Sequence, residues 1–80
     1  MDEATELRRR ATRWRQTAEV TRAEVGGLRC AGAMTWRGGS ADVFQQVLDR
    51  QIGELRDLAD RKDALAAMLD RLAAMVEQAA

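Results

Sequence analysis

The sequence predicts an all-α protein: a hairpin of two long antiparallel helices that dimerises into a four-helix bundle. Its 80 residues contain no proline and are rich in alanine, leucine, arginine and glutamate, which favour helix over strand. Apolar residues recur at steps of three and four on both sides of a short glycine-rich segment. The apolar arc of the second half is also wider than one neighbouring helix can cover, which favours a bundle of four.

The first helix is expected from about residue 3 to about residue 32. Glu6 precedes Arg10 in the favoured order for an ion pair one helical turn apart. Gly26 and Gly27 interrupt the last third, where we expect a bend, fraying or the close approach of a neighbouring helix. The small and apolar positions alternate in steps of four and three, as in the seam of a coiled coil, and are Leu7, Ala11, Trp14, Ala18, Thr21, Val25 and Leu28.

A turn is expected at about 33–40, and the second helix from about 40 to about 78. Because proline is absent, glycine must make the turn. Gly38 is expected there because it permits a positive φ, while the indole of Trp36 either forms a recognition surface or covers the helix ends. Ser40 is the expected N-cap of the second helix, and Asp42 suits the positive end of its dipole.

Two neighbouring apolar stripes run along the second helix. The main stripe is Ala41, Phe44, Leu48, Gln51, Leu55, Leu58, Lys62, Leu65, Leu69, Leu72 and Val76. The second is Ile52, Ala59, Ala66 and Ala73, and it is widened by Val47, Met68 and Met75. Gln51 and Lys62 either fix the register of the helices or lie at the edge of the stripe. We predict a partner interface of Leu48, Ile52, Leu55, Leu58, Ala59, Leu65, Ala66, Leu69 and Leu72.

Charge favours pairing between the two helices over binding to nucleic acid. Residues 1–40 hold eight basic and five acidic side chains and residues 41–80 hold five and eight, so the halves carry +3 and −3 and the net charge is +0. Two antiparallel helices of opposite charge attract along their edges. The arginines near the amino terminus are interleaved with acids, so a solvated helix face is expected there and no nucleic-acid partner.

Catalytic and cofactor chemistry is not expected. The chain has no histidine or tyrosine, and Cys30 alone forms neither a catalytic dyad nor a metal site. We therefore predict a protein that is not an enzyme, with no catalytic, cofactor-binding or metal-binding residues and no cofactor. Cys30 is expected to be partly buried near the turn. No signal peptide and no apolar run of the ~20 residues needed to span a membrane is found.

The string W-R-G-G-S-A-D-V-F between two long helices, from Trp36 to Phe44, resembles the WXG100 (ESAT-6-like) proteins. These are small substrates of type VII secretion systems in actinobacteria and Firmicutes, helical hairpins that pair as homodimers or heterodimers. The resemblance implies that Trp36 and Gly38 lie at the hairpin tip, where the indole is part of a composite export signal. It also implies a secretion ATPase as a partner, and a cytoplasmic location before export to the medium or cell surface without a cleaved signal peptide.

One departure from the family bears on the partner. Export-competent partners carry an aromatic residue four positions before an acid after the second helix, whereas here Asp70 and Glu77 follow Ala66 and Ala73 at that spacing. Either a partner chain supplies this half of the signal or the carboxyl terminus is truncated. We therefore favour a heterodimer, with another WXG100-like chain or the helical domain of a secreted toxin, over a homodimer. The role is then that of an export carrier or a small effector.

A different class of function is compatible with the same helical pattern. The chain is alternatively a cytoplasmic coiled-coil adaptor or antitoxin-like regulator, unrelated to secretion, whose W-x-G is a chance turn. Gene neighbours discriminate between the two. A neighbouring gene of similar length that encodes its own W-x-G, or a large neighbouring gene that ends in a toxin domain, favours secretion. An adjacent gene for a small toxin or a transcription factor favours the alternative.

Overall fold

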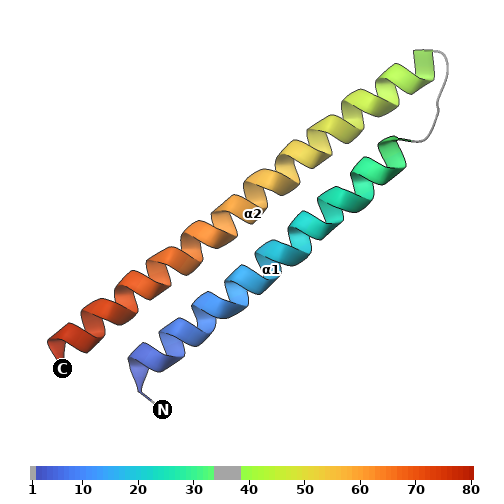
Figure 1. Cartoon of the computed structure of the whole chain (residues 1–80). Coiled ribbons are helices and arrows are strands. Elements are labelled where there is room, and N and C mark those ends of the chain that lie inside the picture. Colours follow the sequence, from blue (N-terminus) through green and yellow to red (C-terminus); the bar gives the residue numbers. More distant parts are fainter. Residues whose placement is uncertain (1, 34–38) are drawn as a thin grey trace.

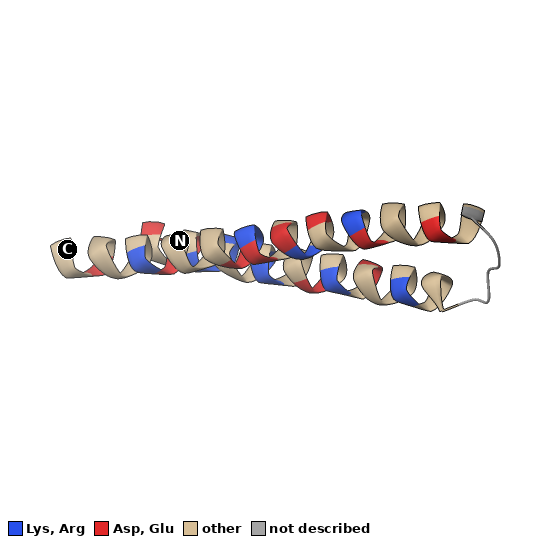
Figure 2. Ribbon diagram, turned by 90° about the horizontal axis from the view of Figure 1, so that it is seen from above, with Lys and Arg blue, Asp and Glu red and all other residues tan. Residues whose placement is uncertain are grey.

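The computed structural model describes residues 2–33 and 39–80 as two long antiparallel helices. Helix α1 spans Glu3–Gly32 and helix α2 spans Gly39–Ala79. The helices lie side by side (Figure 1) and cross at a shallow angle (Figure 2), in a rod whose Cα atoms extend over 64 × 15 × 10 Å. The predicted all-α hairpin is confirmed, and pairing into a four-helix bundle stays a prediction. Trp36 and Gly38, the residues predicted for the tip, lie outside the described residues.

Both ends of α1 are capped. Asp2 has an extended backbone, and its carboxylate accepts a hydrogen bond from the backbone N–H of Thr5 at 2.6 Å. This bond, with a further one from the Thr5 side chain, lowers the pKa of Asp2 below its ordinary value. At the other end, the amide of Gln45 donates to the carbonyl of Gly32 at 2.8 Å. The end of α1 is therefore tied to the side of α2.

The helix boundaries and exposures correct two smaller expectations. Helix α2 begins at Gly39, so Ser40 lies inside its first turn and not at the N-cap position. Cys30 is exposed, not partly buried, because it lies on the side of α1 that is turned away from α2. Among the described residues, no helix is long and apolar enough to cross a membrane.

Alanine columns form the seam between the helices. Every seventh residue of a helix returns to nearly the same face, and most of the buried positions follow this spacing. They are Ala4, Ala11, Ala18 and Val25 in α1, and Ile52, Ala59, Ala66 and Ala73 in α2. The sequence did not say which of the two stripes of α2 packs against α1, and the structure centres the second stripe on it. Alanine permits this because a single methyl group lets two backbones approach closely.

Larger side chains fill the core near the end of α1. Val25, Leu48 and Ile52 form a buried cluster, against which Leu28, Phe44 and Leu55 pack. A Cβ added at Gly32 would collide with Cδ2 of Leu48, so this leucine side chain would have to shift to make room for it. Close approach was one expectation for Gly26 and Gly27, but a Cβ at either would meet nothing within 4 Å and α1 continues through both.

Ion pairs follow one edge of the hairpin, and we call this row the arginine ladder. Its rungs step seven residues forward in α1 and seven back in α2, and they are Arg8 with Glu77, Arg15 with Asp70, and Arg22 with Asp63. Figure 2 shows charges of both signs along both helices. The hydrogen bond from Arg22 to Asp63 is the main reason that the pKa of Arg22 is raised. Exposed ion pairs stabilise little, so the ladder chiefly selects the register.

Lys62 fixes the register from within the packed face. Its ammonium donates to Oγ1 of Thr21 at 2.7 Å, and Thr21 is only 3% exposed. The same hydroxyl donates to the carbonyl of Thr17 at 3.0 Å, so its donor and acceptor roles are both used. The sequence left two roles open for Gln51 and Lys62, the polar residues that interrupt the main stripe. Lys62 fixes the register of the helices, whereas Gln51 is exposed and lies at the edge of the stripe.

Candidate partner-binding surface

The hairpin leaves a row of large apolar side chains uncovered, which we call the outer face of α2. It consists of Leu58, Leu65, Met68, Leu72 and Met75. Leu58 is 42% exposed and Leu72 46%, and the two methionines are more exposed still. Leu65 is half-buried. These residues remain uncovered because α1 packs against the alanine column of α2 and reaches only part of the neighbouring leucine column.

The structure divides the nine residues of the predicted partner interface into three groups. Four are buried inside the hairpin: Leu48, Ile52, Ala59 and Ala66. Three lie half-buried along its margin: Leu55, Leu65 and Leu69. Only Leu58 and Leu72 are exposed. Adjacent stripes on one helix are hard to separate by spacing alone, because spacing does not say which of them the chain's own second helix will occupy.

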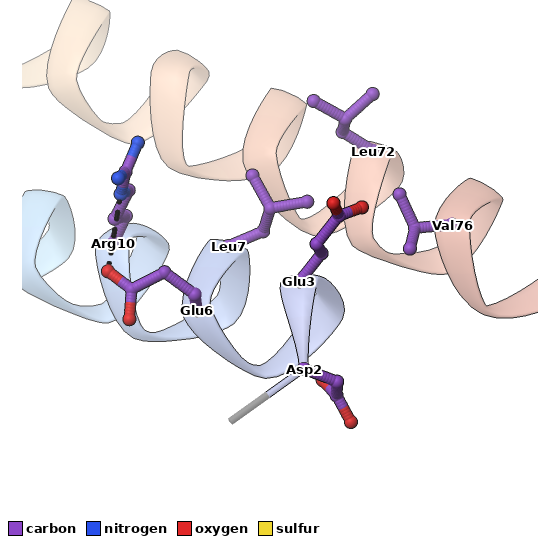
Figure 3. A pocket seen from close by; sticks show the side chains of 7 residues that line it. All are labelled: Asp2, Glu3, Glu6, Leu7, Arg10, Leu72 and Val76. Atoms are coloured by element: carbon purple, nitrogen blue, oxygen red, sulfur yellow. Dashed lines mark hydrogen bonds and ion pairs between the residues drawn. The ribbon is translucent and has the colours of Figure 1, made fainter.

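An apolar hollow adjoins the outer face at the open end of the hairpin, where the two termini lie (Figure 3). Leu7 points from α1 toward α2, and Leu72 and Val76 complete the apolar part of the lining. Charged side chains complete the lining: Asp2, Glu3, Glu6 and Arg10. Arg10 and Glu6 form the predicted ion pair at 3.4 Å. Apolar lining with charged neighbours suits contact with another protein chain.

Trp14 lies on the open side of α1, opposite the edge that carries the arginine ladder. It is 38% exposed and neighbours Arg10, Arg13 and Thr17 around a shallow depression. The sequence placed Trp14 in the predicted seam of the first helix, and this exposure leaves the indole accessible to a partner chain. Its seam neighbours Ala11 and Ala18 are buried.

The sequence contains a signal for the arginine ladder that is separate from the apolar stripes. Arginine recurs at every seventh position of α1, at Arg8, Arg15, Arg22 and Arg29, and acids recur likewise at Asp63, Asp70 and Glu77. Matching heptad columns of opposite charge identify the facing edges of two antiparallel helices. The ladder thereby marks which edge of the hairpin is already occupied and which is open.

In the part of the chain that the structure describes, no three side chains of the metal-ligating types gather into a possible ion site. Comparison with known protein families, curated proteins and solved structures finds no match to this chain. Inference about function therefore depends on the open surface and on the W-x-G string.

Proposed function

We propose that this protein works by binding another helical chain through the outer face of α2. The observation that carries the proposal is the exposure of Leu58, Met68, Leu72 and Met75 along one line of a helix. Burying the exposed parts of four such side chains gains roughly 3–6 kcal/mol by the usual transfer values. A helix with an apolar stripe has the matching shape, because it can lie along the whole row.

We further propose that this binding serves type VII secretion, as in the WXG100 proteins that the chain resembles. The support is the W-x-G string at Trp36–Gly38, placed between two helices of the expected kind. In this proposal Trp36 and Gly38 form one half of an export signal, and a partner chain supplies the acidic half. The protein then acts as a heterodimer partner or export carrier for another secreted helical protein or toxin.

An export assay separates this function from that of a cytoplasmic adaptor, which would use the same outer face. Trp36→Ala is expected to abolish secretion while leaving helicity and pairing nearly intact, because the indole serves recognition in this proposal. The measurement is an immunoblot of culture filtrate and cell pellet from the source organism, with circular dichroism of the purified variant. Arg37→Ala, at the variable position of W-x-G, is the matched control and should be secreted. Normal secretion of Trp36→Ala would remove the proposed role.

A further inference from the structure

One step beyond the arginine ladder, the register of the helices sets two arginines against each other. Each rung lies seven residues further along α1 and seven residues back along α2, and the next step leads from Arg22 and Asp63 to Arg29 and Arg56. Both of these arginines are exposed, and neither takes part in an ion pair among the described residues. An edge that is neutralised along the ladder therefore carries two uncompensated positive charges near the end of α1.

The acids of the chain lie at the wrong spacing to neutralise this pair. Side chains of one helix meet at spacings of three and four residues, and at these spacings Arg29 has no acid within α1. Arg56 has only Asp60, whose carboxylate already accepts a hydrogen bond from Arg22 at 3.2 Å. Because like charges that face each other repel, the two arginines oppose the pairing of the helices. A negatively charged group from outside the chain would relieve this repulsion.

The same four-residue motif, G-x-L-R, carries each of the two arginines. It spans residues 26–29 in α1 and residues 53–56 in α2. In both copies the leucine, Leu28 or Leu55, packs against the buried cluster near the end of α1. The arginine follows directly and lies on the edge that carries the ladder. The core therefore fixes the helical turn beneath each arginine, and both guanidinium groups are presented from rigid elements on one edge.

The glycine of each motif leaves open space beside its arginine. A helical side chain leans toward the preceding turn, so Arg29 leans over Gly26 and Arg56 leans over Gly53. A Cβ at either glycine would meet nothing within 4 Å. The surface next to each guanidinium is therefore bare helix backbone, which another chain can approach closely.

We infer that this place binds an acidic segment of another protein chain, and we call it the arginine notch. It consists of Gly26, Arg29, Gly53 and Arg56. A guanidinium group binds a carboxylate through two parallel N–H bonds, so the pair suits two neighbouring carboxylates. The bare backbone favours a polypeptide over a free anion, because a small anion gains nothing from a surface that is open to a chain. The inference goes beyond the proposed function, since the notch lies on the opposite edge of the hairpin from the outer face of α2.

Binding of a glutamate peptide tests the inference. The probe is fluorescein-labelled hexaglutamate, titrated with the full chain at low salt and followed by fluorescence anisotropy, with hexaglutamine as the reference peptide. Arg29→Gln combined with Arg56→Gln should weaken binding roughly tenfold or more, because both charge-assisted contacts are lost. The matched control is Arg50→Gln combined with Arg71→Gln, which removes the same charge from two exposed arginines on one column of α2. This control should bind the peptide like the native chain.

Arg56→Glu separates peptide binding from folding. The substitution places an acid against Arg29, so it should remove peptide binding and yet raise the urea midpoint at low salt, with a smaller rise at high salt. The inference is overturned if the native chain does not bind hexaglutamate, if the control loses as much affinity as the notch variant, or if Arg56→Glu lowers the urea midpoint. Equal competition by inorganic phosphate, or by a single-stranded oligonucleotide of the same charge, would overturn the assignment to an acidic protein segment.

Discussion

Gly32 shows how one residue sets the distance between the helices. A Cβ at this position would meet Cδ2 of Leu48, whose side chain is 5% exposed and packs in the buried cluster with Val25 and Ile52. Gly26 and Gly27 have the same chemistry in the same helix but face open space. The sequence marked the pair as the place for a bend, fraying or a close approach, because a double glycine is conspicuous. It could not single out Gly32, because that requirement depends on which residue of α2 lies opposite.

Gly32→Ala is therefore expected to destabilise the hairpin, even though alanine is the better helix former. Overpacking against buried Leu48 costs about 1–3 kcal/mol, which exceeds the gain of up to ~1 kcal/mol in helix propensity. Gly26→Ala, the matched control, should raise the free energy of unfolding by about 0.5–1 kcal/mol. Urea denaturation followed by circular dichroism measures both. Equal stabilisation by the two substitutions would show that Gly32 is not at a close contact.

At the scale of the element, the heptad pattern predicted two helices and both apolar stripes of α2. The pattern did not say which stripe would be the more deeply buried, because leucine carries more apolar area, whereas the depth of burial here depends on how closely the backbones approach. Ala59, Ala66 and Ala73 are fully buried, while Leu58 and Leu72 are exposed. Sequence spacing reports which residues share a face of a helix. The choice between adjacent faces is made by the packing of two helices together.

Enlarging an alanine of the seam should therefore separate the helices. Ala66→Leu is expected to lower the free energy of unfolding by roughly 1–3 kcal/mol, because four heavy atoms must fit where one methyl group is fully buried. Ala64→Leu is the matched control, on the exposed side of the same turn, and should be nearly neutral. Chemical denaturation of both variants is the measurement. A neutral Ala66→Leu would mean that the alanine column is not the contact between α1 and α2.

On the scale of the whole molecule, the two long edges of the hairpin differ in chemistry. The arginine ladder occupies one edge, so that edge is already paired within the chain. The other edge carries Trp14 and the outer face of α2, and it remains open. The sequence predicted that the apolar arc exceeds what one helix can cover. Only the structure could separate the open part from the buried part, and this separation reduces the candidate surface to a single line of residues.

The most direct test of the account is the mass in solution of the native protein and of Leu58→Asp, over a range of concentrations and with the product of the neighbouring gene. We expect the 8.9 kDa native chain to assemble and Leu58→Asp to be a folded monomer of unchanged helicity, because an aspartate within the outer face cannot be buried unpaired. Val43→Asp, an exposed apolar position away from that face, should assemble like the native chain. A native chain that is a stable folded monomer, both alone and with its neighbour, would contradict the account.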